Sequence, residues 1–572
     1  RAMDSNDLER ERGITILAKN TAIDYKGTRI NILDTPGHAD FGGEVERIMK
    51  MVDGVVLVVD AYEGTMPQTR FVLKKALEQN LKPVVVVNKI DKPAARPEGV
   101  VDEVLDLFIE LEANDEQLDF PVVYASAVNG TASLESDKQD ENMQSLFETI
   151  IDYVPAPIDN QDEPLQFQVA LLDYNDYVGR IGVGRVFRGK MRVGDNVSLI
   201  KLDGSIKNFR VTKIFGYFGL KREEIEEAQA GDLIAVSGME DINVGETVTP
   251  HDHQEALPVL RIDEPTLEMT FRVNNSPFAG REGDYVTARQ IQERLEQQLE
   301  TDVSLKVTPT DQPDAWIVAG RGELHLSILI ENMRREGFEL QVSKPQVILR
   351  EIDGVLSEPF ERVQCEVPSE NAGAVIESLG ARKGEMLDMM TTDNGLTRLI
   401  FMVPARGMIG YTTEFMSMTR GYGIINHTLE EFRPRVKAQI GGRRNGALIS
   451  MDQGQATSYA IINLEDRGVN FMEPGTEVYE GMIVGEHNRE NDLTVNITKA
   501  KHQTNVRSAT KDQTQTMNRP RILTLEEALQ FINDDELVEV TPENIRLRKK
   551  ILNKSAREKE AKRVKQMMQE DQ

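Results

Sequence analysis

Three strand-like runs in the first part of the chain each end in a short polar segment, and this arrangement constrains the fold more than any other feature. The pairs are Arg29–Leu33 before Asp34–Phe41, Pro83–Val87 before Asn88–Asp91, and Phe120–Ala125 before Ser126-Ala127. Apolar runs such as Val55–Val59 suit strands that are covered on both faces. Because the runs alternate with amphipathic helical patterns, residues 1–158 are predicted to form βαβ units around a parallel sheet.

The first polar segment has the chemistry of a phosphate and metal site. A carboxylate at Asp34, where a strand meets a glycine turn, can orient Mg²⁺ through water, and the Gly37 backbone N–H can approach a γ-phosphate. His38 follows directly, where an imidazole can position an attacking water and stabilise charge during hydrolysis. Upstream, the Thr15 hydroxyl can ligate Mg²⁺ in a segment that orders with a triphosphate. We therefore predict Thr15 and Asp34 as metal ligands and His38 as the catalytic residue.

The other two polar segments have the chemistry of a guanine site. Asp91 can accept two hydrogen bonds from guanine N1 and N2, a pairing that adenine cannot offer. The Lys89 stem can lie over the base, and Asn88 can tie the loop and bond the base. The backbone at Ser126-Ala127 offers an N–H to the guanine oxygen, a weak signal alone that gains value from its place in the series. GTP and GDP are the predicted ligands.

One expected motif has no counterpart in the sequence. Nothing matches the G-x-x-x-x-G-K-[ST] loop that should precede these segments and hold the phosphates. The chain opens at Arg1, and we expect the first strand and the phosphate loop upstream of it. That strand should be central in the sheet, so a polypeptide that starts at Arg1 is predicted to bind GTP poorly and to have an unstable nucleotide-binding domain. Tight nucleotide binding by that polypeptide would refute this prediction.

Composition narrows the class of protein. The chain has 572 residues, of which 40% are hydrophobic and 28% charged, as in an ordinary multidomain globular protein. A formal net charge of −28 argues against a protein that binds naked nucleic acid. Cys365 is the only cysteine, which excludes a disulfide framework and favours a small buried strand residue. No apolar run approaches the roughly 18 residues of a membrane span, and a cytoplasmic location without membrane contact is expected.

The pattern changes several times further along the chain. Short glycine-separated strands at 164–258 predict a β-barrel, and 262–345 and 350–431 each predict a four-stranded sheet with two helices on one face. A mostly strand-like segment with a helix at Leu525–Phe531 follows at 432–545. Residues 546–572 are strongly basic and helical, either a solvated tail or one that contacts RNA. The predicted fold class is thus multidomain: α/β, then β-barrel, then α+β.

Taken in their order along the chain, the motifs resemble those of GTPases of the elongation-factor class. The chain as a whole resembles the BipA/TypA family over essentially its full length. The finer match rests on five segments: Asp119–Ala127, Val318–Leu326, Glu331–Leu340, Arg444–Ser450 and Asn491–Asn496. The last two fall in the C-terminal region in which that family differs from its relatives. The resemblance implies a P-loop-type GTPase domain, a translation-factor β-barrel, two ferredoxin-like domains and a family-specific C-terminal domain.

The resemblance also implies partners. It implies GTP hydrolysis stimulated at the factor-binding site of the 70S ribosome, with roles in large-subunit assembly and in adaptation of translation to stress or low temperature. Away from the ribosome a monomer is expected, and guanosine tetraphosphate stays open as a ligand. Guanidinium groups in or beside a Gly441-Gly442 loop suit phosphate contact and base stacking. The residues expected to contact ribosomal RNA and A-site tRNA are Arg433, Arg435, Lys437, Arg443 and Arg444.

Two other interpretations stay open. Within the class, the chain could be a factor of the LepA or tetracycline-resistance type, although residues 443–496 argue against both. Pro345–Glu358 is too short to hold the tRNA-mimicking domain of elongation factor G. Outside the class, the chain could be a non-catalytic ribosome-binding module, if the phosphate loop is truly absent. The motif G-x-x-x-x-G-K-[ST] in the upstream coding sequence would remove this rival.

Overall fold

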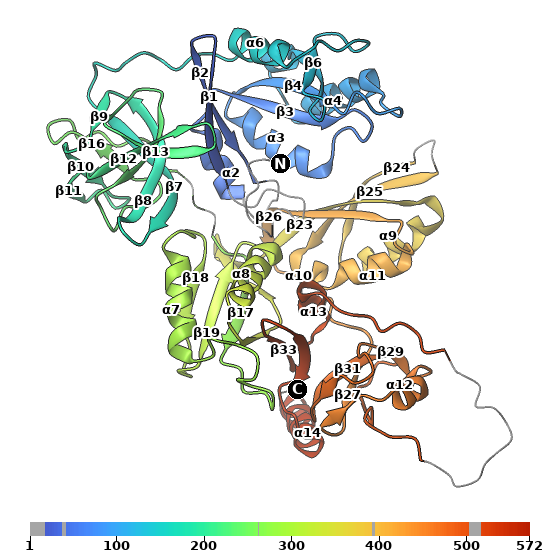
Figure 1. Cartoon of the computed structure of the whole chain (residues 1–572). Coiled ribbons are helices and arrows are strands. Elements are labelled where there is room, and N and C mark those ends of the chain that lie inside the picture. Colours follow the sequence, from blue (N-terminus) through green and yellow to red (C-terminus); the bar gives the residue numbers. More distant parts are fainter. Residues whose placement is uncertain are drawn as a thin grey trace. The chain divides into compact units, whose positions relative to one another are not determined.

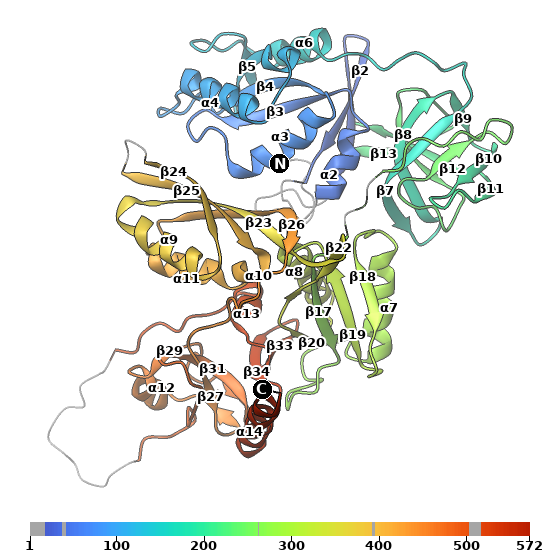
Figure 2. The same ribbon diagram turned by 180° about the vertical axis from the view of Figure 1, so that it is seen from behind.

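The structure is a computed structural model. It describes residues 8, 18–36, 42–260, 262, 264–391, 395–502 and 516–571. The chain divides into two compact units, one of residues 1–264 with 297–304 and one of residues 265–296 with 305–572. Figures 1 and 2 show their elements from opposite sides. Within the described ranges, no helix has the length and apolarity needed to cross a membrane.

The first unit begins with the predicted parallel α/β domain. Its sheet has the order β3-β4-β5-β6, in which β3, β4 and β5 are parallel and β6 is antiparallel to β5. Leu73 and Val100 cover one face of the sheet from α3 and α4, while Leu146 covers the other from α6. The elements are β3 (Gly54–Asp60), α3 (Pro67–Glu78), β4 (Lys82–Asn88), α4 (Pro97–Glu110), α5 (Asp115–Leu118), β5 (Val122–Ser126), β6 (Thr131–Ser133) and α6 (Gln144–Tyr153).

A separate hairpin precedes this sheet. β1 (Lys19–Tyr25) and β2 (Thr28–Asp34) pair only with each other among the described strands, and α2 (Gly42–Met49) follows. In the same part of the chain β3 has β4 on one side and, among the described residues, no strand on the other. Two valines of β3, Val56 and Val58, are 40% and 57% exposed, although they belong to an apolar run.

An antiparallel domain follows in the same unit. Its main sheet has the strand order β11-β10-β16-β7-β8-β15-β12-β13, and the strands enclose a core that includes Phe167, Leu199 and Val248. Gly184 lies inside β8, where a Cβ would come within 1.8 Å of the Gln168 carbonyl oxygen, so this close approach of strands requires glycine. The strands are β7 (Gln166–Asn175), β8 (Gly179–Arg188), β9 (Lys190–Arg192), β10 (Asn196–Ile200), β11 (Ile206–Arg210), β12 (Lys213–Phe218), β13 (Lys221–Ile225), β14 (Glu227–Gln229), β15 (Leu233–Ser237) and β16 (Thr247–Thr249).

The second unit contains the two predicted ferredoxin-like domains, except for residues 297–304 of the first. The first has the strand order β18-β19-β17-β20, and the second has β24-β25-β23-β26. The elements of the first are β17 (Leu267–Arg272), α7 (Ala288–Leu299), β18 (Lys306–Pro309), β19 (Ala315–Gly320), α8 (Glu323–Arg335) and β20 (Leu340–Ser343), before the short β21 (Gln346–Val347). Those of the second are β22 (Arg350–Ile352), β23 (Val355–Pro368), α9 (Ala372–Ala381), β24 (Glu385–Thr391), β25 (Leu396–Pro404), α10 (Ala405–Met408), α11 (Tyr411–Met418) and β26 (Ile424–Pro434). Cys365 is buried in β23, as predicted.

The C-terminal domain continues the sheet of the first ferredoxin-like domain. β20 pairs with β33 in antiparallel register from Leu340↔Val540 to Ser343↔Leu537, and the sheet then runs β33-β34-β31-β27-β32. The elements are β27 (Ala447–Ser450), β28 (Gly454–Gln455), α12 (Ser458–Leu464), β29 (Gly468–Asn470), β30 (Glu477–Val478), β31 (Met482–His487), β32 (Leu493–Val495), α13 (Leu525–Phe531), β33 (Glu536–Val540), β34 (Ile545–Lys549) and α14 (Lys554–Glu570). The two domains therefore share one sheet.

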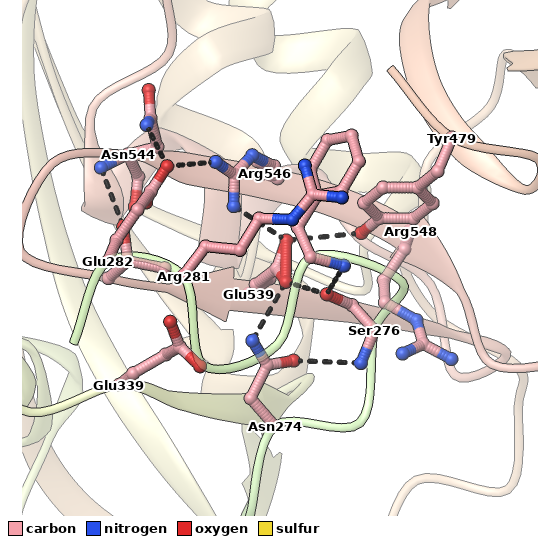
Figure 3. Close-up of polar contacts among 12 residues, drawn as sticks. Asn274, Ser276, Arg281, Glu282, Glu339, Tyr479, Glu539, Asn544, Arg546 and Arg548 are labelled. Carbon is pink, nitrogen blue, oxygen red and sulfur yellow. Dashed lines mark hydrogen bonds and ion pairs between the residues drawn. The ribbon is translucent and has the colours of Figure 1, made fainter. Parts of the chain in front are cut away.

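A buried carboxylate lies where these two domains meet (Figure 3). The Glu539 side chain is 0% exposed and accepts a hydrogen bond from Asn274 Nδ2 at 2.8 Å and another from the Ser276 hydroxyl. Tyr479 Oη donates to it at 3.2 Å and Arg546 Nη1 at 3.1 Å. Asn274 and Ser276 belong to the first ferredoxin-like domain, so this carboxylate links it to the C-terminal domain.

The prediction of a basic helical tail at 546–572 is wrong for its first residues, which form a strand. Arg546, Arg548 and Lys549 lie in β34 and are 9%, 3% and 2% exposed. Arg546 also pairs with Glu282 from the first ferredoxin-like domain, and Lys549 Nζ lies 2.7 Å from a carboxylate oxygen of Glu536. Acidic partners neutralise the buried charges of Arg546 and Lys549, whereas Arg548 donates to the neutral side-chain oxygens of Asn275 and Gln341. The exposed basic helix begins only at Lys554, with α14.

Candidate nucleotide site

Two of the predicted motifs meet at one edge of the parallel sheet. β4 and β5 are neighbours, so Asn88–Asp91 and Ser126-Ala127 follow strand ends that lie together. The Ala127 N–H donates to Asn88 Oδ1 at 3.0 Å, and the Ser126 hydroxyl donates to Asp91 Oδ1 at 2.9 Å. The Asp91 carboxylate is thus oriented by a buried serine while its residue stays exposed. These two hydrogen bonds bring the predicted guanine-recognition residues of the two loops together.

Lys89 has an unusual backbone and an unpredicted partner. Its φ of 64° lies in the left-handed region, which is uncommon for a residue other than glycine. Its ammonium group lies 2.9 Å from Asp60 Oδ2 at the end of β3. Asp60 is opposite Asn88 in the parallel register, so the two strand ends bring the pair together. The position of Asp60 could have been noticed in the sequence, because Asp60 ends an apolar run just as Asn88 does.

The Asp60 carboxylate also closes the turn that follows β3. Its Oδ1 accepts hydrogen bonds from the backbone N–H groups of Tyr62 at 2.8 Å and Glu63 at 3.1 Å. Burial would raise the pKa of Asp60, but the hydrogen bonds from Lys89 and from these N–H groups outweigh it and lower the pKa to about 2. Asp60 is therefore ionised at neutral pH.

The predicted phosphate and metal residues are only partly covered by the structure. Asp34 is half-buried at the end of β2, opposite Lys19 in the hairpin. Thr15, Gly37 and His38 lie outside the described residues. A threonine hydroxyl and an aspartate carboxylate are hard oxygen donors of the kind that Mg²⁺ prefers, with water and phosphate oxygens completing its shell. The donor types of Thr15 and Asp34 therefore fit that ion.

Arg443 differs from its predicted role as an RNA contact. Its side chain is 7% exposed, and its guanidinium pairs with both carboxylate oxygens of Glu536 at 2.7 and 3.0 Å. The same guanidinium lies 4.2 Å from the ring centroid of Phe531. These contacts engage Arg443 inside the C-terminal domain, so it is not available for RNA. Arg444, the next residue, has an 89% exposed side chain.

Of the other predicted RNA contacts, Arg433 lies near the end of β26, while Arg435 and Lys437 lie on the segment that follows it. Arg435 and Lys437 are exposed, and Arg433 is partly exposed with Glu431 2.6 Å away. This segment is held by Arg406, which donates to the carbonyl oxygens of Val436 and Ala438 at 2.6 and 2.7 Å. The backbone on either side of the exposed Lys437 is therefore fixed by hydrogen bonds to Arg406.

The turn before α8 has a structural role. The buried His325 ring accepts a hydrogen bond at Nδ1 from the Arg321 backbone N–H at 3.1 Å. Such a contact stabilises the start of a helix. The contact and its burial give His325 a role in packing at the start of α8.

Comparison with known families covers most of the chain. Five family models match: the elongation factor Tu GTP-binding domain at 1–156, elongation factor Tu domain 2 at 179–249, elongation factor G domain III at 284–344, the elongation factor G C-terminus at 355–440 and the TypA/BipA C-terminal domain at 445–554. Together with the folds above, these matches define a GTPase of the elongation-factor class, which binds GTP and GDP.

Individual relatives place the chain within that class. It is 76% identical over 565 residues to the large ribosomal subunit assembly factor BipA of Bacillus subtilis, covering 99% of this chain and 92% of that protein. The factor of the same name from Escherichia coli K12 is 53% identical, over 97% of this chain and 92% of its own length. A crystal structure of a Thermus thermophilus protein has a TM-score of 0.51 at 17% identity, covers 76% of this chain and 91% of its own, and shares the fold. The chain belongs to the BipA/TypA family, which removes the LepA-type alternative.

Proposed function

We propose that the protein is a ribosome-associated GTPase that acts in assembly of the large ribosomal subunit. The observation that carries the proposal is the pair of contacts that orients Asn88 and Asp91 toward one site, Ala127 to Asn88 and Ser126 to Asp91. The printed names of the relatives, large ribosomal subunit assembly factor BipA, support the ribosomal role. Stress and low temperature are the conditions in which we expect that role to matter.

The site residues divide the work between base, metal and water. Asn88, Lys89 and Asp91 bind the guanine with the Ser126-Ala127 backbone, which selects guanine over adenine. Thr15 and Asp34 hold Mg²⁺, directly or through water, and the Gly37 N–H contacts the γ-phosphate. His38 positions the water whose oxygen forms a bond to the γ-phosphorus as the bond to the β–γ bridging oxygen breaks, which releases GDP and phosphate.

We further propose that the ribosome is contacted partly through the segment before the C-terminal domain. Arg433, Arg435, Lys437 and Arg444 carry cations on exposed or partly exposed side chains. Guanidinium groups match phosphate geometry and stack on bases, so ribosomal RNA and A-site tRNA are the proposed targets. The acidic remainder, with a net charge of −28 for the whole chain, limits binding to RNA elsewhere.

The nucleotide part of the proposal is tested by turnover of the full-length gene product with and without 70S ribosomes. The matched variant is Asp91→Asn, because xanthine has a carbonyl oxygen where guanine has an amino group, and an amide N–H can donate to it. The variant should lose GTP turnover and regain it with xanthosine triphosphate. Equal GTP affinity in variant and wild type would contradict the assignment of Asp91.

The ribosomal part is tested in cells. Depletion of the protein should lead to accumulation of incomplete large subunits on sucrose gradients, most clearly at low temperature. Wild-type protein should restore the profile, and Asp91→Asn should not. An unchanged profile on depletion would remove large-subunit assembly from the proposal while leaving nucleotide binding intact.

A further inference from the structure

Asp60 lies outside the predicted motifs but contacts Lys89. Lys89 is the residue with a long flexible side chain in Asn88–Asp91, which we call the base loop. Asp60 ends β3 and Lys89 follows β4, and Figure 1 shows these strands side by side. The distance from Lys89 Nζ to Asp60 Oδ2 is 2.9 Å. The Asp60 side chain is 16% exposed and that of Lys89 is 46% exposed. The anion is thus the more fixed member of the pair.

Asp60 is held independently of Lys89. Its other oxygen is occupied by the N–H groups of Tyr62 and Glu63, and the Ala61 N–H bonds to the Asn88 carbonyl oxygen at 2.8 Å. Arg96 then anchors the turn from outside, donating from its backbone N–H to the Ala61 oxygen and from Nε to the Tyr62 oxygen. The carboxylate therefore has a fixed place before any ligand arrives.

The geometry points to Asp60 as a positioning residue for guanine-nucleotide binding, acting by holding the Lys89 side chain in place for the base. This inference rests on the proposed function, because it takes Asn88–Asp91 as the base-binding loop. A lysine side chain has many rotamers, and ordering it at the moment of binding weakens affinity. A tether formed before binding removes that loss. Asp60 itself makes no contact with the nucleotide in this scheme.

The test is the dissociation rate of a fluorescent GDP analogue from the full-length gene product. Asp60→Asn keeps an oxygen for the Tyr62 and Glu63 N–H groups and removes only the negative charge toward Lys89. Ordering one long side chain corresponds to a rate increase of roughly 3- to 10-fold. The matched control is Glu110→Gln, which removes the 2.7 Å ion pair with Arg70 between α3 and α4 of the same domain. The control should leave the rate unchanged.

A double-mutant cycle separates positioning from a general effect on folding. Lys89→Met keeps an apolar stem and removes the ammonium group that Asp60 holds. If Asp60 acts through Lys89, adding Asp60→Asn to Lys89→Met should change the rate by less than twofold. An equal increase in both backgrounds, or no increase from Asp60→Asn alone, would overturn the inference.

The proposed function fails in a different way. If Asp91→Asn leaves the preference for guanine over xanthine unchanged, the base loop is misassigned, whatever Asp60 does. If Asp91→Asn switches the preference while Asp60→Asn has no effect, the base loop stands and the positioning role of Asp60 is refuted.

Discussion

Glu539 and Arg546 form an ion pair of 3.1 Å inside the sheet that joins the first ferredoxin-like domain to the C-terminal domain. Their side chains are 0% and 10% exposed, so neither charge has water to replace its partner. Arg546 also pairs with Glu282, and Glu539 accepts from Asn274, both from the other domain. A buried pair of this kind adds little net stability compared with apolar residues, but its disruption leaves a charge without compensation.

We expect Glu539→Ala to lower the free energy of unfolding by about 3–5 kcal/mol. Because β20 and β33 pair directly, the loss should reach the first ferredoxin-like domain as well. Trp316, the only tryptophan of the chain, lies buried in β19 of that domain and reports its unfolding by fluorescence. Urea titration should show the Trp316 transition at lower urea in the variant.

The control for this prediction is an exposed pair. Glu560→Gln removes the partner of Arg563 on α14, where the side chains are 42% and 60% exposed. Exposed pairs contribute about 0–1 kcal/mol, so the Trp316 transition should stay in place. A Trp316 midpoint that also stays unchanged in Glu539→Ala would mean that the two domains unfold independently despite their common sheet.

Arg443 and Arg444 offer a matched comparison of adjacent arginines. Arg443→Ala should destabilise the protein by about 3 kcal/mol, since it leaves the buried Glu536 carboxylate with one partner fewer. Arg444→Ala, at a side chain that is 89% exposed, should change stability by less than about 0.5 kcal/mol. Urea unfolding followed by circular dichroism measures both.

For ribosome binding, in contrast to stability, we expect a direct contribution from Arg444 and none from the buried Arg443. Arg444→Ala should weaken binding to 70S ribosomes and reduce the dependence of affinity on salt, as expected for a lost phosphate contact. Affinity measured at two or more salt concentrations checks this. Full affinity in Arg444→Ala would remove that residue from the proposed RNA contacts.

Burial raises the pKa of the Cys365 thiol to about 12, well above the value near 8.5 in an unfolded chain. Between these values the unfolded state loses the thiol proton and the folded state keeps it, so stability should fall as pH rises through this window. At pH 10 the loss is about 2 kcal/mol from this group. Cys365→Ala removes the thiol, so its stability should fall less between pH 8.5 and 10 than that of the wild type.

Urea midpoints at the two pH values, for wild type and variant, measure this difference directly. A second readout is the reaction of the thiol with a disulfide reagent at pH 8, which should require unfolding of the sheet that contains β23. Rapid labelling of the native protein, or equal pH slopes in the two proteins, would contradict the buried position of Cys365.

His38→Ala in the full-length gene product is expected to reduce ribosome-stimulated hydrolysis by about 10²–10⁴-fold, because it removes the group that positions the attacking water. GTP affinity should remain, since the base contacts come from other residues. Single-turnover hydrolysis on 70S ribosomes and a separate nucleotide titration distinguish the two effects. Equal turnover in variant and wild type would remove His38 from the mechanism.

Local motifs explain why so much of the nucleotide site follows from the sequence. Asn88 and Ser126 end strands whose apolar runs are readable by themselves, Asp91 follows three residues after Asn88, and neighbouring parallel strands bring these ends together. The ferredoxin-like domains follow from short alternations of strand and helix for the same reason. Asp60 was missed because a single aspartate after a strand has many uses, and only the register of β3 on β4 gives it a partner.

The fate of the basic residues shows the limit of local patterns. Arg443, Arg546 and Lys549 look like solvated or RNA-contacting cations, since nearby sequence offers them few acids. Their partners include Glu282, which is 264 positions from Arg546, and Glu536, which is 93 positions from Arg443. Charge balance in a buried site depends on such distant partners, and a run of basic residues contains no information about them.

The shared sheet also has a consequence for synthesis of the protein. Gln341 on β20 and Arg548 on β34 are hydrogen-bonded but 207 positions apart in the chain. At roughly 5–20 residues per second, β20 waits on the order of 10–40 s for the strands that will cover its edge. During that interval a nascent chain presents an unpaired strand to its neighbours, and polysomes hold several such chains close together. Completion of the first ferredoxin-like domain thus waits for synthesis of β33, and ribosome stalling before β33 has emerged should expose the edge of β20 to aggregation.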